Sequence, residues 1–325
     1  RVAKLESREK DLKRDVAVAR KKYDRLRNRR SVRLALVLAQ RLRFLRHIPG
    51  SRRLYRAISK LPPRPSATRL PRVANRSEII SAVTNLRPPR PRVGHGLVSI
   101  VVPTRDGIHH LKRLAAGLHN RTDYPSFELV LVDNASSDGT IEWASQLEGF
   151  PVTVIRNERN ESFSKACNQG AAAAAGDYLL FLNNDVDPIN PGWLTEMVAV
   201  ARERGDAGAV GALLIYPESL PGERGELQLS VQHRGIGYTW HNGRPRAINL
   251  GRGESPVGEV LAATYPVASV TAACMLVPRV VFDEVGKFHE DYVYGTEDVD
   301  LNLSIRQSGR TIYFCGQAAL FHHES

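Results

Sequence analysis

A cluster of amides and carboxylates follows an apolar run in the segment YLLFLNNDVDP, residues 178–188. Carboxylates are costly to desolvate at the end of a buried strand, so they either form a solvated turn before Pro188 or bind a ligand. Carboxylates two residues apart on an extended chain point roughly the same way, which suits a hard divalent cation such as Mg²⁺ or Mn²⁺. The residues that could bind a cation or a hydroxyl group here are Asn183, Asn184, Asp185 and Asp187.

Two further groups, both near the end of the sequence, have side chains suited to catalysis. Glu297 and Asp298 begin the predicted helix 297–307, where acidic residues either favour the helix dipole or act as a general base. The pair His322 and His323 ends the final predicted strand. Imidazole is a common metal ligand, and alternation along a strand lets only one of the pair face inward.

These groups need a scaffold that brings distant residues together, and the apolar pattern of residues 97–205 predicts one. Strands are expected at 97–104, 128–134, 152–157 and 177–184, and helices at 107–120, 138–147, 161–175 and 191–204. Continuous apolar strands that alternate with helices indicate an α/β fold, with a mostly parallel sheet covered on both faces. Ligands of such sheets bind beyond the carboxyl ends of the strands, where this sequence concentrates its polar residues. The absence of G-x-G-x-x-G after the first strand argues against a dinucleotide-binding fold.

Charge divides the 325 residues into two regions. Residues 1–95 contain 28 Lys and Arg against 6 Asp and Glu, whereas the remaining 230 residues contain 18 against 28. No apolar run reaches the roughly 18–20 residues that span a bilayer. The three widely spaced cysteines are expected to be small buried residues rather than a disulfide framework, which fits a reducing compartment.

The basic first region is expected to consist of helices and a linker. Residues 1–30 show a heptad-like spacing that indicates either a coiled coil or a lone charged helix. The helix predicted at 31–48 suits an anionic membrane surface, a partner helix or packing on the next domain. Residues 49–96 are rich in Arg and Pro and are predicted to be a linker. No aromatic-interleaved or zinc-finger pattern accompanies the arginines, so no specific nucleic-acid partner is expected.

Several ordered motifs in residues 97–325 resemble glycosyltransferase family 2, whose inverting enzymes have the nucleotide-sugar-binding GT-A fold, and in particular its rhamnosyltransferase-like members. The motifs are VSIVVPTRDG, LVLVDNASSDGT, NERNESFSKACNQG, YLLFLNNDVD, VTAACMLVPRVVFDEVGKF, YGTEDVDLNLSIRQSGRTIYF and ALFHHES. The resemblance implies a nucleotide-binding half at about 97–205 and an acceptor and catalytic half at about 206–325.

The resemblance also assigns roles to individual residues. It implies nucleotide contacts by the residues Pro103, Thr104, Arg105, Asp133, Asn160, Asn183 and Asn184. Asn183 stands where the family's Asp-x-Asp motif has its first carboxylate, which contacts ribose. Asp185 becomes the metal ligand, with Asp187 as a helper, and His322 is preferred to His323 because the family has a histidine about 24 residues after the base. Asp298 is the expected base, and Glu297 would orient the acceptor.

The function implied is metal-dependent, inverting transfer of a sugar from a nucleotide-diphosphate donor to a glycan or lipid-linked acceptor in cell-surface polysaccharide synthesis. The cofactor would be Mn²⁺ or Mg²⁺, and the basic region would hold the protein at the cytoplasmic face of the membrane. Asn183, Ser162 and Ala272 depart from the family pattern, which leaves a non-catalytic glycan- or nucleotide-binding domain as the alternative. Residues 217–268 are expected to be an acceptor-facing loop. Trp193 and Trp240 are expected to pack, with stacking on a sugar as the alternative.

Overall fold

The computed structural model describes residues 81–82, 95–217, 220–221, 227–241, 244–292 and 295–324. All of them lie in a compact unit formed by residues 69–325. The predicted charged helical region 1–48, with its coiled coil, lies outside the described residues, as does most of the predicted linker 49–96. Within that linker, Ser81 and Ala82 are helical, and Ala82 packs against one of the hydrophobic clusters of the domain.

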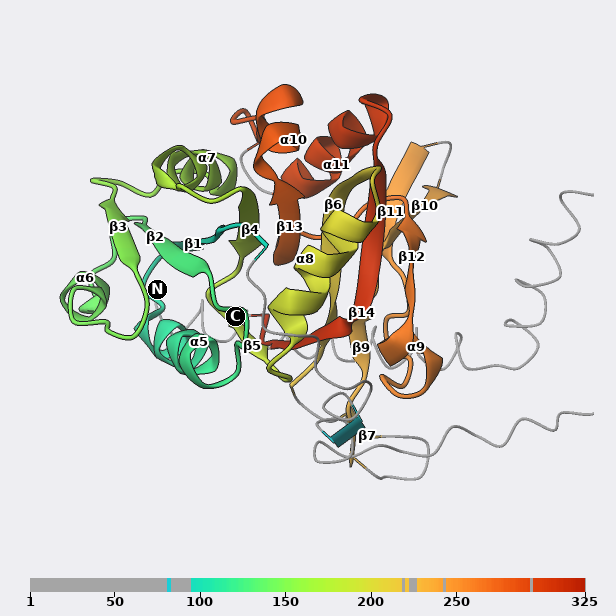
Figure 1. The fold of residues 1–325 in the computed structure, drawn as a ribbon, viewed down its shortest axis with the longest axis horizontal. Helices are drawn as coiled ribbons and strands as arrows, with labels where there is room; N and C mark the ends of the chain where they lie inside the picture. Colours follow the sequence, from blue (N-terminus) through green and yellow to red (C-terminus); the bar gives the residue numbers. More distant parts are fainter. Residues whose placement is uncertain are drawn as a thin grey trace, which may run out of the picture. The chain divides into compact units, whose positions relative to one another are not determined.

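A sheet of ten strands forms the centre of the domain (Figure 1). Its main path runs β12-β14-β6-β13-β4-β1-β2-β3, while β5 pairs with β14 and β9 pairs with β6. These strands are β1 (Val98–Thr104), β2 (Phe127–Asp133), β3 (Val152–Arg156), β4 (Tyr178–Leu182), β5 (Val186–Pro188), β6 (Ala207–Ile215), β9 (Val231–His233), β12 (Thr264–Val267), β13 (Cys274–Pro278) and β14 (Thr311–His322).

The sheet is mostly parallel, as predicted. Strand β1 pairs in parallel with β2 and β4, β2 with β3, and β14 with β6. Strand β13 is antiparallel to both of its neighbours, and β12 is antiparallel to β14. The four strands predicted in residues 97–205 begin within one residue of the observed strands. Strands β1, β2 and β4 are mostly apolar and buried, as a sheet covered on both faces requires, whereas the edge strand β3 is partly exposed.

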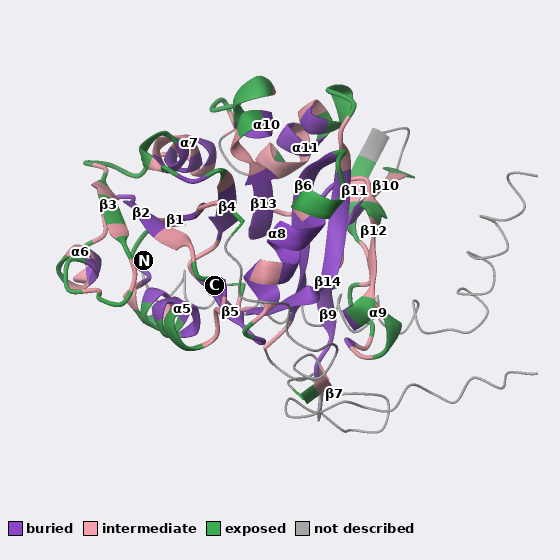
Figure 2. Cartoon of the chain, viewed as in Figure 1, coloured by how far each residue is buried: buried purple, intermediate pink, exposed green. Residues whose placement is uncertain are grey.

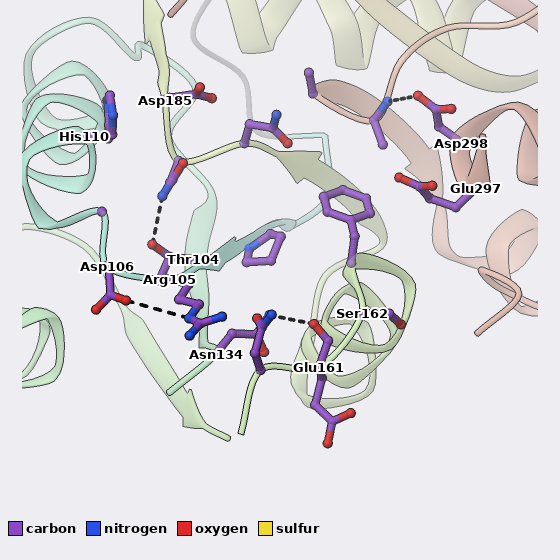
Figure 3. Close-up of a pocket in the computed structure, with 18 of the residues that line it drawn as sticks. Thr104, Arg105, Asp106, His110, Asn134, Glu161, Ser162, Asp185, Glu297 and Asp298 are labelled. Carbon is purple, nitrogen blue, oxygen red and sulfur yellow. Dashed lines mark hydrogen bonds and ion pairs between the residues drawn. The ribbon is translucent and has the colours of Figure 1, made fainter. Parts of the chain in front are cut away.

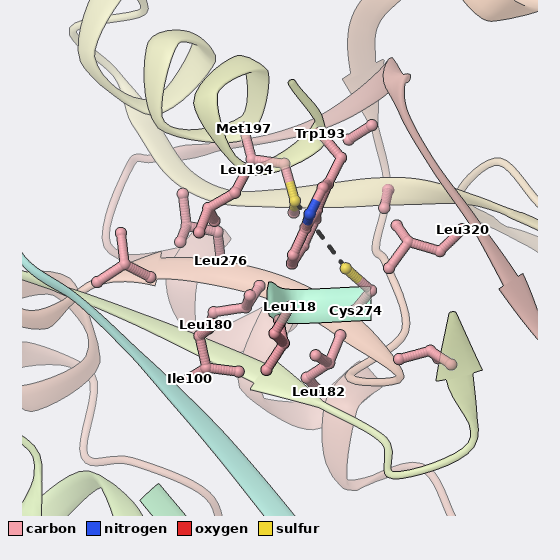
Figure 4. Close-up of a cluster of buried hydrophobic side chains, with 14 of the residues drawn as sticks. Ile100, Leu118, Leu180, Leu182, Trp193, Leu194, Met197, Cys274, Leu276 and Leu320 are labelled. Carbon is pink, nitrogen blue, oxygen red and sulfur yellow. Dashed lines mark hydrogen bonds between the residues drawn. The ribbon is translucent and has the colours of Figure 1, made fainter. Parts of the chain in front are cut away.

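Helices cover both faces of the sheet, and alternate residues of each strand supply the two cores. Ile100 and Leu180 pack on one face with Trp193, against α5 and α8 (Figure 4). Figure 2 shows that both of these helices contain buried residues. Val101 and Phe181 point to the other face, which α7, α10 and α11 cover. The helices are α5 (Ile108–Asn120), α6 (Thr140–Ala144), α7 (Phe163–Ala173), α8 (Trp193–Glu203), α9 (Glu259–Ala262), α10 (Arg279–Glu284) and α11 (Glu297–Gln307).

The expectation of a loop at 217–268 is wrong for much of its length. Strands β9 and β12 join the main sheet, and β10 (Ile236–His241) pairs with β11 (Arg244–Asn249) in a separate hairpin. A further short pair is formed by β7 (Leu220–Pro221) and β8 (Leu227–Gln228). The Gly and Pro residues that indicated a loop mark the turns between these strands.

The expectation that the cysteines are small buried residues is confirmed. The cysteines Cys167, Cys274 and Cys315 are free and buried, and Cys274 packs beside Met197 in the core (Figure 4). Among the described residues, no helix combines the length and the apolar character that crossing a membrane requires.

Candidate active site

A cavity of about 770 Å³ opens at the carboxyl ends of β1 and β4 (Figure 3). The loops after β1, β2 and β3 line one side, and the beginning of α11 lines the other. The predicted site residues that line it are Pro103, Thr104, Arg105, Asn160, Asn183, Asn184, Asp185, Glu297 and Asp298. The structure therefore gathers residues up to 195 positions apart into one cleft, as the carboxyl-end rule for parallel sheets predicts.

Asp185 and His322 meet at the edge of this cleft. The Oδ1 atom of Asp185 lies 3.2 Å from Nε2 of His322, and both side chains are largely buried. The pairing of β5 with the end of β14 places Val186 opposite His322, which brings the two groups together. The side chain of His323 instead lies 2.8 Å from a guanidinium nitrogen of Arg113, so His322 is the member of the pair that faces Asp185.

The partners of His322 indicate which of its nitrogens is available to a cation. Its Nδ1 lies 2.7 Å from the side-chain oxygen of Gln232 on β9. An N–H at Nδ1 that donates to this oxygen leaves a lone pair on Nε2, which faces Asp185 and also lies 3.3 Å from the Asn183 amide nitrogen. A carbonyl oxygen that accepts from the other ring nitrogen in this way commonly fixes the tautomer of a metal-binding histidine.

The donor set of Asp185 and His322 fits a divalent cation. A carboxylate oxygen and an imidazole lone pair repel at 3.2 Å unless a proton or a cation lies between them. In octahedral coordination with bonds of about 2.1 Å, two neighbouring ligand atoms lie about 3 Å apart. This is close to the 3.2 Å between Oδ1 of Asp185 and Nε2 of His322. No group of three or more His, Cys, Asp or Glu side chains suited to a metal occurs in the described part of the chain. Mg²⁺ sites often have only one or two carboxylates and take their remaining ligands from water and substrate phosphates.

Asp187, predicted as a metal helper, does not line the cavity. Its carboxylate forms an ion pair with the guanidinium of Arg121 on α5, which also donates to the carbonyl oxygen of Pro188 at 2.7 Å. A carboxylate neutralised in this way is a poor additional ligand, so in this structure Asp187 holds β5 against α5.

Asp133, predicted to contact the nucleobase, is fully buried and does not line the cavity. Its two carboxylate oxygens accept from the backbone N–H of Ser136 at 3.3 and 3.2 Å. The neighbouring Asn134 lines the cavity and accepts from the Asn157 amide at 2.8 Å. In this structure Asp133 shapes the loop, while Asn134 presents its side chain to the cleft.

Several polar residues that line the cleft are held by contacts with other residues of the domain. The Asn184 amide donates to the hydroxyl of Thr104 at 2.9 Å, which fixes the loop after β4 against β1. Arg105 is exposed and lies 3.7 Å from the carboxylate of Asp106. Ser162, which replaces the family's glycine, caps α7 by accepting from the N–H of Lys165 at 3.3 Å, a role for which serine is well suited.

Glu297 and Asp298 face the cleft from the first turn of α11 (Figure 3). Asp298 accepts from the backbone N–H of Ala272 at 3.2 Å and from that of Val299 at 2.7 Å. Burial nevertheless raises the pKa of Asp298 above its ordinary value of 3.8. Burial also raises the pKa of Glu297, and the negative charge of Asp298 adds to this effect. One buried carboxylate oxygen of Glu297 has no hydrogen-bond partner among the described residues.

His110 is a cleft residue that the sequence did not single out. It lies on the first turn of α5 and lines the cavity near Asp185 (Figure 3). Its Nδ1 is buried and has no hydrogen-bond partner within the described ranges. Burial lowers the pKa of His110, while the negative charge of Asp185 opposes this shift. The sequence feature that could have indicated His110 is the histidine pair in the first turn of the helix that follows the motif PTRDG.

Comparison with known proteins gives concordant results. Residues 99–252 match the sequence profile described as Glycosyl transferase family 2. Protein y4gI of Sinorhizobium fredii is 36% identical over 72% of this chain and 25% of its own length. The O-antigen biosynthesis protein RfbC of Myxococcus xanthus is 34% identical over 70% of this chain and 17% of its own. The chain thus spans a quarter or less of these two relatives.

A shorter relative is matched over most of its length. The N-acetylglucosaminyl-diphospho-decaprenol L-rhamnosyltransferase of Mycobacterium tuberculosis is 28% identical over 70% of this chain and 76% of its own.

Solved structures share the fold. GalNAc-T7 with UDP, GalNAc and Mn²⁺ aligns with a TM-score of 0.55 and 20% identity, over 70% of this chain and 44% of that one. The mannosyltransferase PcManGT of Pyrobaculum calidifontis, in complex with GDP-Man and Mn²⁺, aligns with a TM-score of 0.52 and 16% identity. That alignment covers 76% of this chain and 68% of the mannosyltransferase.

Proposed function

Because the chain belongs to glycosyltransferase family 2, we propose that it transfers a sugar from a nucleotide-diphosphate donor to a glycan or lipid-linked glycan in cell-surface polysaccharide synthesis. The observation that carries this proposal is the shared cleft, with the Asp185–His322 pair beside one part of it and the Glu297–Asp298 pair on another. The names of the O-antigen biosynthesis protein and the rhamnosyltransferase support the same type of reaction.

The donor would lie over the ends of β1 and β4, with its base and ribose near Pro103, Thr104, Arg105, Asn134, Asn160, Asn183 and Asn184. Asp185 and His322 would hold the divalent cation. The chemistry that such a cation would supply when bound is Lewis-acid stabilisation of the charge that develops on the departing diphosphate. His110, on the same side of the cleft as Asp185, is positioned to donate a hydrogen bond to a phosphate oxygen.

Asp298 is proposed as the general base of a single displacement. Its carboxylate takes the proton of an acceptor hydroxyl while that oxygen forms a bond to the anomeric carbon. The bond from this carbon to the phosphate oxygen breaks, and its electron pair leaves with the nucleoside diphosphate, so the configuration inverts. A raised pKa makes the carboxylate a stronger base near neutral pH. Glu297, the neighbouring carboxylate, would orient the acceptor.

The basic residues 1–95 are proposed to bring the protein to the inner face of a membrane that carries lipid-linked acceptors. They contain 28 Lys and Arg against 6 Asp and Glu. Clustered cations of this kind are attracted to anionic headgroups by about 1 kcal/mol each near the surface. The heptad spacing of residues 1–30 would add an oligomeric or partner contact.

Release of nucleoside diphosphate from a panel of nucleotide sugars, with Mg²⁺ or Mn²⁺ present, tests the proposed function. Steady release of the diphosphate from at least one donor is expected, since water can replace a missing acceptor. A folded protein that binds nucleotide but hydrolyses no donor would favour the alternative, a non-catalytic binding domain.

A further inference from the structure

The hairpin of β10 and β11 carries an exposed aromatic face. The first residue of the hairpin, Ile236, is fixed to the domain because its N–H donates to the carbonyl oxygen of Ser269 at 2.7 Å. Trp240 is 72% exposed and Tyr238 is 41% exposed. Side chains two residues apart on a strand share a face, so the two rings lie side by side. Trp193, by contrast, is fully buried in the core, so the expectation that tryptophan packs is confirmed for Trp193 and wrong for Trp240.

The opposite strand places a small residue beside Tyr238. Tyr238 is paired with Ala247, whose side chain is too small to cover its ring, while Trp240 is paired with Pro245 and is itself 72% exposed. Ile248 is paired with Gly237 and therefore lies on the other face of the hairpin. Of the six exposed large hydrophobic side chains among the described residues, Tyr238 and Trp240 lie on this face. Two adjacent exposed aromatic side chains, unlike scattered exposed residues, indicate a binding surface.

The aromatic face adjoins the acidic end of the cleft. The hydrogen bond from Ile236 holds the hairpin to Ser269. Burial raises the pKa of Tyr238, and the negative charge of Asp298 adds to this effect. Ser269 lies two residues before Thr271, which lines the cleft beside Ala272, and the N–H of Ala272 donates to Asp298. The hairpin is thus linked to the proposed base, whereas the proposed nucleotide contacts lie at the ends of β1 and β4.

We propose that the Tyr238–Trp240 face is an acceptor subsite that binds a pyranose ring by stacking. The assignment to the acceptor rests on the proposed function, since the hydroxyl that attacks must reach Asp298. A pyranose ring has an apolar C–H face and a polar rim, and it matches an amphipathic aromatic pair whose electron-rich faces attract polarised C–H groups. The acceptor would lie along the hairpin, with its reactive hydroxyl directed into the cleft.

An exposed tryptophan also suits the interface of a bilayer, and this alternative predicts a different ligand for the same face. If Trp240 inserts into lipid, its removal weakens binding to vesicles and leaves saccharide binding unchanged. The test therefore includes both a saccharide and a lipid surface.

Saturation-transfer NMR on the full chain, with nucleoside diphosphate and Mg²⁺ present, measures binding of methyl pyranosides of rhamnose, N-acetylglucosamine, glucose, galactose and mannose. At least one pyranoside is expected to bind, and Trp240→Ala is expected to weaken its binding about tenfold or more, as for other central aromatic contacts. Trp240→Phe should retain most of the affinity. Ile248→Ala, on the opposite face of the same hairpin, is the matched control and should bind as the unaltered protein does.

Three results would overturn the proposal. The first is that no pyranoside binds the unaltered protein, and the second is that Trp240→Ala and Ile248→Ala bind equally well. The third is that Trp240→Ala loses only its binding to vesicles of phosphatidylglycerol and phosphatidylcholine. Trp240-dependent pyranoside binding without any hydrolysis of nucleotide sugars would instead contradict the proposed function and keep the subsite.

Discussion

The carboxylates of Glu297 and Asp298 are neighbours in sequence but have different surroundings. Asp298 is held by the N–H groups of Ala272 and Val299, whereas Glu297 has a buried oxygen without a partner among the described residues. The carboxylate of a general base must be held in one orientation toward the acceptor hydroxyl. The two backbone N–H groups hold the carboxylate of Asp298, the proposed base, in this way. Glu297 also lines the cleft, and the role proposed for it is to orient the acceptor.

Replacing Asp298 by Asn tests the base. Asn cannot accept a proton, so Asp298→Asn is expected to lower kcat for transfer by about 10²–10⁴-fold, with the affinity for nucleoside diphosphate unchanged. Asp283→Asn makes the same chemical change at an exposed position of α10 and should leave the rate unaltered. Transfer by Asp298→Asn at a near-normal rate would rule out the assignment.

The pH dependence of transfer follows from the same residue. Because the pKa of Asp298 is raised above 3.8, the carboxylate becomes protonated at a higher pH than an ordinary Asp. As pH falls, kcat/KM is therefore expected to decline through a pKa above 3.8, as the active, charged form is lost. A profile of kcat/KM against pH measures this limb. If kcat/KM instead declined through a pKa at or below the ordinary value of 3.8, the group that titrates would not be Asp298.

At the scale of elements, the contact of α5 with β5 decides the role of Asp187. Arg121 reaches from the end of α5 to both Asp187 and the Pro188 carbonyl. The short strand β5 in turn pairs with β14 and presents Val186 opposite His322. The ion pair therefore supports the segment that carries Asp185, without being a part of the cation site.

Arg121→Ala is expected to lower the free energy of unfolding by about 1–2 kcal/mol. The loss leaves the largely buried Asp187 without its cation, and partial exposure of Arg121 moderates the effect. Denaturant unfolding measures it, with Arg159→Ala as the control, because the Arg159–Glu161 pair is exposed on its Arg side and no change is expected. If Asp187→Asn abolished metal-dependent nucleotide binding while the fold remained stable, Asp187 would be a ligand after all.

The packing of α7 on the sheet depends on a glycine. A methyl group at Gly170 would collide with Val101 on β1 and approach Val132 on β2 at 3.1 Å. Gly170→Ala is expected to destabilise the domain by about 1–3 kcal/mol through overpacking. Gly205→Ala is the matched control, since nothing lies within 4 Å of its added carbon. Equal midpoints of denaturation for the two variants would show that α7 can shift at no cost.

At the scale of the whole molecule, the sequence predicted the parts of the fold that local patterns determine. Strands β1, β2 and β4 are mostly apolar and buried, and the polar residues after the strands indicated the cleft, including Asn184 and Asp185. Alternation along β14 predicted that only one histidine of its final pair would face inward, and the structure places His322 beside Asp185.

Long-range pairings explain what the sequence did not predict. The ion pair of Asp187 with Arg121 joins residues 66 positions apart, and no local pattern marks it. Gln232, which binds His322, lies on β9 in a segment whose Gly and Pro residues resembled a loop. The antiparallel strand β13 is likewise determined by tertiary pairing with β4 and β6.

We propose that Asp185 and His322 hold one divalent cation beside the diphosphate of the donor. Titration calorimetry of nucleoside diphosphate, with Mg²⁺ or Mn²⁺ and after chelation, measures it in the unaltered protein and in Asp185→Ala and His322→Ala. The account predicts that affinity requires the metal and falls about tenfold or more in each variant. Equal affinity with and without metal, or variants that bind as the unaltered protein does, would contradict it.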